Sequence, residues 1–156
     1  MLENNFKEAL IIISKKLKNR RWAVIGSFNL VLQGMALQPN DLDVIVHLSE
    51  LKNMQDLFQE YKPSAIQQLT PLGGHPSWAI KIKISGVTVQ VLGEKSKGTY
   101  FSKLLKKRVL ILRIDNTKIP CFTLDAESDA YAIKRKEKSR LIRSFIDNQV
   151  PNSAQK

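Results

Sequence analysis

Residues 22–46, WAVIGSFNLVLQGMALQPNDLDVIV, constrain the fold of this chain more than any other segment. A short apolar run ends in Gly-Ser, a helical stretch follows over residues 27–34, and a second apolar run opens with Asp41 and Asp43. Side chains alternate between the two faces of a strand, so both aspartates must point to one face while Leu42 points to the other. The segment therefore predicts two strands joined by a helix, with two carboxylates on one face of a sheet.

Helical and alternating patterns follow one another along the rest of the chain. Apolar residues at helical spacing predict helices, and apolar residues at every second position predict strands. The predicted helices cover residues 4–18, 49–61, 99–108 and 125–147, the predicted strand pairs cover 77–93 and 109–124, and residues 63–76 are predicted to be rich in loops. This order predicts a mixed α/β fold: a mixed sheet with flanking helices and a C-terminal helical segment. We expect one domain over residues 1–148 and a frayed tail over 149–156.

Composition narrows the classes of function. The chain has 156 residues, a formal net charge of +11 and a single cysteine, Cys121. One cysteine excludes an internal disulfide and suits the cytoplasm, and no apolar run approaches the roughly 18 residues of a membrane span. Excess positive charge favours phosphate-rich partners such as NTPs or RNA. It counts against a strongly cationic substrate such as an aminoglycoside, unless the site is locally acidic.

The Gly-Ser turn and the two aspartates are compatible with one chemistry. Two carboxylates on one strand face repel unless a cation lies between them, and Mg²⁺ prefers one or two carboxylates together with substrate phosphates. Glycine at position 26 allows close approach of the backbone, and the N-terminus of the following helix can bind phosphate. Each feature alone is common. A Gly-Ser turn directly before residues 28–40, together with an Asp-x-Asp pair directly after them, indicates this chemistry much more specifically.

The motifs "VIGSFNLVLQG" and "PNDLDVIV" resemble those of the DNA polymerase beta-like nucleotidyltransferase superfamily, in its small members. The segments "ISGVTVQVLGE" and "IPCFTLDAESDAYAIKRKEKSRLI" extend the resemblance over most of residues 22–146. Members transfer NMP from an NTP to a hydroxyl by a two-metal mechanism. The resemblance implies that Asp41 and Asp43 ligate Mg²⁺ and that Gly26 and Ser27 bind the β- and γ-phosphates.

The chain departs from this pattern at the third carboxylate. The resemblance implies an acid in the second strand of the hairpin, where this sequence has Gln90. A glutamine can offer a carbonyl oxygen to a metal, but it carries no charge and cannot accept the proton of the nucleophile. We therefore expect one ion to bind weakly, so that a two-metal site is reduced toward one. Glu94 is expected to leave the strand, whereas Asp125 or Glu127 could fold back to replace the missing acid.

The segment "KRKEKSRLIR", residues 134–143, holds six basic residues and one acidic residue. One interpretation is a solvated helix face, with a core-facing apolar stripe formed by Ala130, Ile133, Leu141, Ile142, Phe145 and Ile146. The other follows from the resemblance and assigns Tyr131, Arg135 and Lys138 to the nucleotide. Basic clusters near residues 15–21 and 103–108 add a possible RNA surface, although no aromatic pattern marks a stacking platform.

Three functions stay open at this point. The chain could be an active, ATP- or other NTP-dependent nucleotidyltransferase that uses Mg²⁺. It could be a degenerate member that binds nucleotide or RNA without turnover, which Gln90 and the net charge favour. It could also be a toxin–antitoxin or other protein-interaction component built on the same fold. The acceptor, the preferred NTP and the oligomeric state are left open by the sequence.

Overall fold

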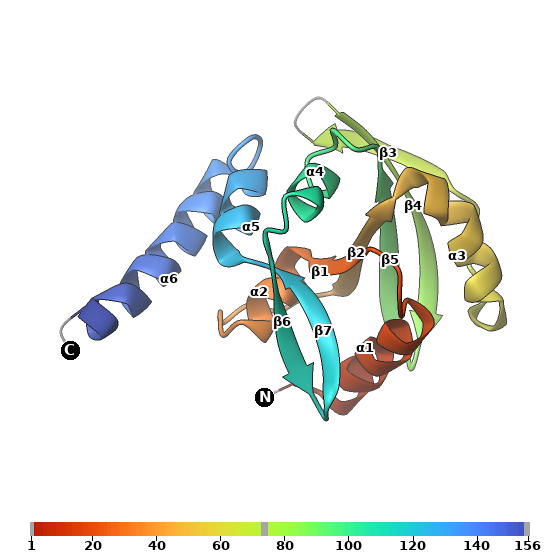
Figure 1. The fold of residues 1–156 in the computed structure, drawn as a ribbon, viewed down its shortest axis with the longest axis horizontal. Helices are drawn as coiled ribbons and strands as arrows, with labels where there is room; N and C mark the ends of the chain where they lie inside the picture. The colour runs from red at the N-terminus through yellow and green to blue at the C-terminus, as the bar shows by residue number, and fades with distance from the viewer. Residues whose placement is uncertain (1, 73–74, 155–156) are drawn as a thin grey trace.

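The computed structural model describes residues 2–72 and 75–154. Its described strands form one seven-stranded mixed sheet in the order β3-β4-β5-β2-β1-β7-β6 (Figure 1). The strands are β1 (Ala23–Ile25), β2 (Asp41–His47), β3 (Gln67–Leu72), β4 (His75–Ile84), β5 (Val87–Glu94), β6 (Val109–Ile114) and β7 (Thr117–Phe122). The pairs β2·β5 and β1·β7 are parallel, and the other neighbouring pairs are antiparallel. The predicted mixed α/β fold is confirmed.

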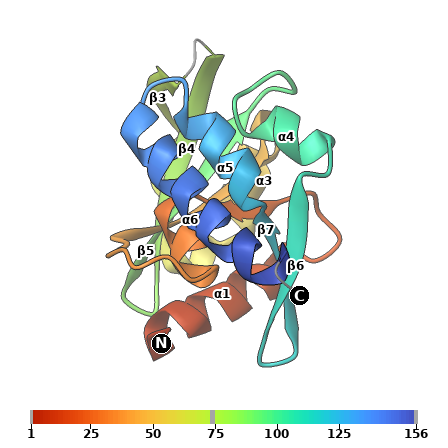
Figure 2. The ribbon, with the colours of Figure 1, turned by 90° about the vertical axis from the view of Figure 1, so that its left-hand side faces the viewer.

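Helices cover both faces of this sheet. The α-helices are α1 (Asn4–Lys16), α2 (Gly26–Leu32), α3 (Leu51–Leu57), α4 (Phe101–Leu105), α5 (Leu124–Tyr131) and α6 (Lys136–Ala154). One buried cluster joins α1, α2 and α3 to the face that carries Leu42 and Val44. A second cluster joins α4 and α5 to the face that carries Ile25 and Ile45 (Figures 1 and 2). None of the helices in the described part of the chain is long and apolar enough to cross a membrane.

Both predicted hairpins are confirmed. The first joins β4 to β5 through Ser85 and Gly86, and the second joins β6 to β7 through Asp115 and Asn116. All four turn residues have positive φ angles, of 53°, 78°, 47° and 65°. Two consecutive residues with positive φ are typical of the two-residue turns whose twist matches the flanking strands. Glycine and asparagine tolerate this conformation, so the turns were visible in the sequence.

The loop-rich region predicted over residues 63–76 is only partly a loop. Residues 67–72 form β3, an edge strand that pairs with β4, and β4 already begins at His75. Proline has no backbone N–H, so Pro71 is compatible with β3 because one side of an edge strand forms no hydrogen bonds to another strand. Gly73 and Gly74, also predicted in this loop, lie outside the described residues.

The single helix predicted over residues 125–147 is wrong, because the structure has two helices there. Helix α5 ends at Tyr131 and α6 begins at Lys136. The intervening residues include no glycine or proline that would signal a break. The helices instead pack against each other through a buried hydroxyl pair, in which Ser139 Oγ donates to the Ser128 carbonyl at 2.8 Å. The frayed tail over 149–156 stays a prediction.

The break also changes which apolar side chains reach the core. Ala130 and Ile142 are buried as predicted, whereas Ile133 is 49% exposed and Leu141 is 59% exposed. The predicted core-facing stripe is therefore wrong at these two positions. The predicted stripe assumed one continuous helix. Because the chain turns between α5 and α6, the apolar side chains before and after the turn do not point in one direction.

Candidate functional site

The two aspartates lie on the same face of β2, as predicted. Leu42 and Val44, which alternate with them, are fully buried on the other face. In the register of the sheet, Asp43 lies between Ile25 of β1 and Gln90 of β5, and Gln90 in turn faces Lys81 of β4. Residues paired across neighbouring strands share a face. The sheet therefore brings Asp43, Gln90 and Lys81 together on the face that also carries α4 and α5.

The carboxyl group of Asp43 is held in an unusual environment. Its Oδ1 atom is buried and has no hydrogen-bond partner among the described residues. Burial, and then the nearby charge of Asp41, raise the pKa of Asp43 to about 6, while Lys138 and Lys81 oppose the rise. A carboxylate oxygen without a donor is costly to bury. The arrangement therefore suits a carboxylate whose partner is a ligand rather than another side chain.

The Gly-Ser turn approaches Asp43 closely. Gly26 has a φ of +78°, and a β-carbon added there would lie 3.0 Å from Oδ2 of Asp43. Helix α2 begins at Gly26 rather than at the predicted Ser27, whose side chain makes no cap. The Ser27 hydroxyl instead accepts a hydrogen bond from the ammonium group of Lys138. Ser27 and Lys138, two predicted site residues that are far apart in the sequence, are therefore in contact at this turn.

Glu127 of α5 lies behind this turn. Its side chain is fully buried, and its Oε2 accepts hydrogen bonds from the Gly26 amide at 2.8 Å and from Nδ2 of Asn29 at 2.7 Å. Burial raises the pKa of Glu127 to about 8. The sequence suggested Glu127 only as a possible third metal ligand. Its one signal in the sequence is its place between Ala126 and Ala130, whose spacing marks a buried helix face.

The C-terminal residues assigned by resemblance also reach this place. The Lys138 ammonium lies 4.6 Å from the centre of the Tyr131 ring, and the Arg135 guanidinium carbon lies 5.6 Å from it. Burial raises the pKa of Tyr131 to about 12, and burial followed by the charge of Arg135 lowers the pKa of Lys138. A half-buried ammonium close to a second cation is an electrostatic setting that favours an anion.

These residues enclose a pocket of about 230 Å³. Five of the eight predicted site residues line it: Gly26, Asp43, Gln90, Tyr131 and Arg135. Ser27 and Lys138 join it through the contacts described above, and Asp41 lies two residues before Asp43 on the same strand face. Apolar and basic side chains complete the lining: Ile25, Leu69, Leu92, Tyr100, Ala130, Ile133 and Lys134.

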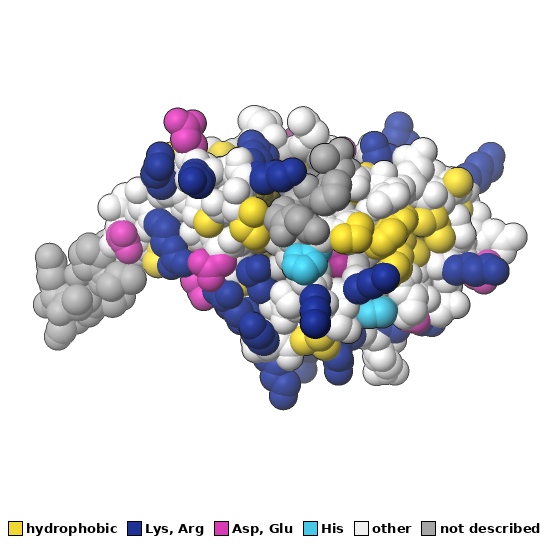
Figure 3. Space-filling view, turned by 90° about the horizontal axis from the view of Figure 1, so that it is seen from above, with side chains coloured by type: hydrophobic (Ala, Val, Ile, Leu, Met, Phe, Trp, Pro, Cys, Tyr) yellow, Lys and Arg dark blue, Asp and Glu magenta, His cyan; other side chains and the backbone are white. Residues whose placement is uncertain are grey.

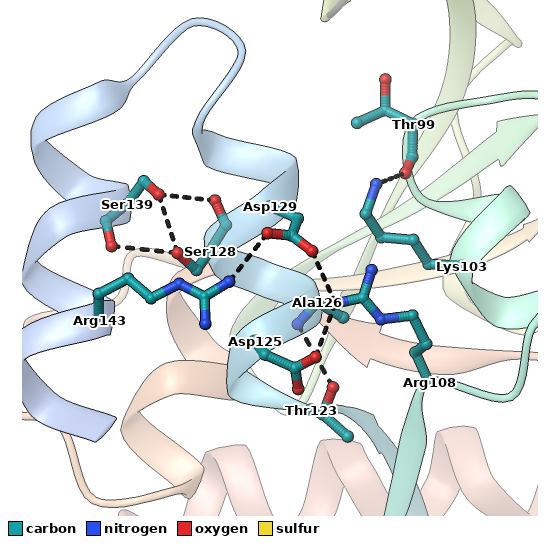
Figure 4. Close-up of polar contacts among 10 residues, drawn as sticks. All are labelled: Thr99, Lys103, Arg108, Thr123, Asp125, Ala126, Ser128, Asp129, Ser139 and Arg143. Atoms are coloured by element: carbon teal, nitrogen blue, oxygen red, sulfur yellow. Dashed lines mark hydrogen bonds and ion pairs between the residues drawn. The ribbon is translucent and has the colours of Figure 1, made fainter. Parts of the chain in front are cut away.

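Two of the three acids considered as replacements for the third carboxylate lie elsewhere. Glu94 does not leave the strand as predicted; it ends β5, is buried, and accepts hydrogen bonds from the amides of Tyr100 and Phe101 at the start of α4. Asp125 is paired with Arg108 at 2.7 Å (Figure 4). Within the described residues, no group of three His, Cys, Asp or Glu side chains could hold a metal ion.

Ion pairs fix the two helices that carry the site. Arg108 bridges Asp125 and Asp129 at 2.7 Å each, and Arg143 of α6 contacts Asp129 at 2.9 Å. Figure 4 shows this network beside the Ser128–Ser139 pair. Arg108 joins α5 to the segment that precedes β6, whereas the Arg143–Asp129 and Ser128–Ser139 contacts link α5 to α6. They hold Tyr131 at the end of one helix and Lys138 near the start of the next within reach of Ser27.

The two histidines lie outside this pocket. His47 accepts a hydrogen bond from the Ser49 amide at 3.2 Å and caps the short 3-10 turn Leu48–Glu50. The helix predicted to begin at Ser49 becomes this turn followed by α3. His47 and His75 both line a separate, largely apolar hollow of about 650 Å³.

Comparisons with known proteins support the fold. No family model and no curated protein matches the sequence. The structure is similar to a putative nucleotidyltransferase from Thermotoga maritima, with a TM-score of 0.71 and 22% sequence identity over 95% of this chain and 96% of that chain. The antibiotic-resistance factor ANT(2'')-Ia, solved with adenylyl-2''-tobramycin, aligns over 94% of this chain and 98% of its own, at a TM-score of 0.46 and 8% identity. The similarity to the Thermotoga maritima protein shows a shared fold, whereas the similarity to ANT(2'')-Ia is too low to do so.

Proposed function

We propose that the protein binds an NTP together with Mg²⁺ in the pocket beside Asp43 and transfers its NMP to a hydroxyl acceptor. The observation that supports this most is the buried Oδ1 of Asp43, which has no partner among the described residues. The same pocket contains the carbonyl-bearing side chain of Gln90 and the Gly26 turn. Carboxylate and amide oxygens are the ligands that Mg²⁺ prefers, and substrate phosphates complete its coordination.

Each side chain then has a role set by its contacts. Asp41 and Asp43 would hold the ion, which when bound neutralises phosphate charge and polarises the transferred group. Ser27 and Lys138 offer a hydroxyl and an ammonium group to the β- and γ-phosphates. Arg135 and the ring of Tyr131 offer a cation and an aromatic surface to the α-phosphate and the base. Gly26 contributes close approach rather than its amide, because Glu127 already accepts that hydrogen bond.

Gln90 limits the rate of transfer in this proposal. It lies beside Asp43, where a carboxylate would hold a second ion and accept the proton of the attacking hydroxyl. An amide does neither of these well. The side chains proposed to bind the NTP and its ion are all present in the chain. The chemical step, in contrast, lacks a carboxylate at position 90 that could accept the proton of the attacking hydroxyl. A protein that binds NTP without turnover is the alternative that this position favours.

Calorimetric titration of the four NTPs, with and without Mg²⁺, tests the proposal. We expect micromolar binding that requires Mg²⁺ and that Asp41→Asn and Asp43→Asn each weaken by tenfold or more, about 1.4 kcal/mol. Asp56→Asn, which removes an exposed carboxylate on α3, should leave binding unchanged. Pyrophosphate release then separates transfer from binding alone. NTP binding that does not depend on Mg²⁺, or absence of binding to any NTP, would refute the proposal.

A groove next to the pocket supports RNA as the acceptor. It has a volume of about 620 Å³ and is lined by Leu37, Lys134, Arg135, Lys136, Glu137, Lys138 and Leu141. Lys134 and Arg135 also line the nucleotide pocket, so the two spaces meet there. Four basic residues against one acidic residue are complementary to a phosphate backbone. Figure 3 shows further Lys and Arg side chains spread over one face of the molecule.

Charge reversal at Lys136 of the groove and at Arg140, which lines the adjoining hollow on α6, tests this second proposal. The double variant Lys136→Glu/Arg140→Glu should weaken binding of a short single-stranded RNA by tenfold or more, while Mg²⁺–NTP affinity stays within about twofold. The control Lys52→Glu/Lys118→Glu makes the same change of charge at exposed positions of α3 and β7. Equal losses in both double variants would show that net charge, and not this groove, binds the RNA.

A further inference from the structure

A buried hydrogen-bond network connects the Gly26–Ser27 turn to the C-terminal helices. Asn29 is fully buried and donates both to Oε2 of Glu127 at 2.7 Å and to the Phe122 carbonyl at 3.0 Å. Gln33 donates to Asn29 Oδ1 at 2.8 Å and to the same Phe122 carbonyl at 2.7 Å. The Gly26 amide is the remaining donor to Glu127. One carboxylate oxygen therefore holds both the turn and the first part of α2.

The other oxygen of this carboxyl group argues against a purely structural role. Oε1 of Glu127 is buried and has no hydrogen-bond partner among the described residues. A glutamine at this position would keep an acceptor for the two donors without burying an acid, and an apolar residue would avoid the unpaired oxygen altogether. Retaining a fully buried acid behind the turn costs stability, which is typical of a position under a functional constraint.

The geometry points to Glu127 as the positioning residue of the nucleotide pocket. From behind the turn it fixes the Gly26 peptide, so that Ser27 meets Lys138 and the backbone passes beside Oδ2 of Asp43. Because it binds the Gly26 amide itself, the triphosphate is left to the hydroxyl of Ser27 and to Lys138. This inference rests on the proposed function, since it assigns how the same pocket is shaped for phosphate.

A comparison of ATP with AMP separates positioning from general stability. The β- and γ-phosphates are the groups proposed to contact Ser27 and Lys138, whereas AMP lacks them. We expect Glu127→Met, which removes both acceptor atoms, to weaken Mg²⁺–ATP binding about tenfold and AMP binding less than about twofold. Glu127→Gln, which keeps an acceptor for the Gly26 amide, should bind both ligands within about twofold of the natural protein. Asp125→Asn is the matched control, because it removes another acid of α5, whose ion-pair partner is Arg108 and not a group of the turn.

Amide hydrogen exchange at Gly26 provides a readout that needs no ligand. In Glu127→Met the Gly26 amide should exchange at least about tenfold faster, while amides in the centre of β2 keep their protection. In Glu127→Gln, which keeps the acceptor, the Gly26 amide should stay protected. Unchanged exchange at Gly26 in Glu127→Met, or equal losses of ATP and AMP affinity, would overturn the inference. If the natural protein binds no NTP at all, the proposed function fails, and the exchange rates still decide whether Glu127 holds the turn.

Discussion

At the scale of single residues, Gln90 determines what the pocket can do. It pairs with Asp43 in the parallel register of β2 and β5, next to a carboxyl group whose pKa is already raised to about 6. A third acid at this position would add repulsion in the absence of metal and a ligand in its presence. We predict that Gln90→Glu lowers the Tm without Mg²⁺, regains it with Mg²⁺, and raises the rate of pyrophosphate release.

The measurement for Gln90→Glu is a thermal unfolding series with and without Mg²⁺, followed by a turnover assay. Gln68→Glu makes the same substitution at an exposed position of β3 and serves as the control. If Gln90→Glu gains stability from Mg²⁺ but no turnover, the chain binds nucleotide without transfer.

Gly26 and Gly86 form a matched pair for testing the turn. Both have a φ of +78°, but a β-carbon at Gly26 would approach Oδ2 of Asp43 to 3.0 Å, whereas one at Gly86 would meet nothing within 4 Å. Alanine at either position costs roughly 1–2 kcal/mol of backbone strain. We predict that only Gly26→Ala also abolishes Mg²⁺-dependent NTP binding. Urea unfolding and calorimetry of the two variants measure this, and equal effects on NTP affinity would contradict it.

Glu127 should make stability depend on pH. Its pKa is about 8 in the folded chain against an ordinary value of 4.5, so between these values the folded protein binds one more proton than the unfolded chain. The free energy of unfolding must then fall as pH rises, by up to about 1.4 kcal/mol per pH unit. Denaturant unfolding at a series of pH values between these limits should show the fall, and Glu127→Gln should flatten it. A slope that survives the substitution would assign the pH dependence to another group.

At the scale of elements, the contact between α5 and α6 decides where Tyr131 and Lys138 lie. Polar contacts of 2.8 to 3.2 Å join the hydroxyl and carbonyl groups of the buried Ser128 and Ser139. We predict that Ser139→Ala destabilises the protein by about 1–2 kcal/mol, because it removes the hydroxyl group that donates to the Ser128 carbonyl inside this buried contact. Ser144→Ala, at an exposed position of the same helix, should change stability by less than about 0.5 kcal/mol. Similar costs for both variants in urea unfolding would show that the hydroxyl pair does not hold the helices together.

At the scale of the whole molecule, the excess of positive charge can attract a phosphate backbone from a distance. The net charge is +11, and the salt bridges among the described residues involve Lys7, Lys16, Arg20, Arg108 and Arg143. The groove residues Arg135 and Lys136 are in none of them. We predict that RNA affinity falls linearly on a plot of log affinity against log salt, and that Lys136→Glu/Arg140→Glu reduces the slope by about 2. A slope that the groove variant leaves unchanged would place the RNA elsewhere on the surface.

The sequence by itself determined the features that depend on neighbours along the chain. Alternation placed Asp41 and Asp43 on one strand face, and turn residues able to adopt positive φ located both hairpins. The resemblance, and not the spacing, implied that position 90 belongs with the two aspartates, and the parallel pairing of β2 with β5 was not predicted. These predictions held because local periodicity and turn chemistry act over a few residues.

Only the tertiary structure decided which distant groups meet. The acceptor of the Gly26 amide is Glu127, about a hundred residues later in the chain, and Glu94 is committed to the start of α4. Neither partner choice leaves a local pattern, because a buried carboxyl group binds whichever donors the packing presents to it. The break between α5 and α6 and the edge strand β3 arose in the same way. Helix continuity and strand pairing there were settled by contacts with other elements, which outweigh local propensity.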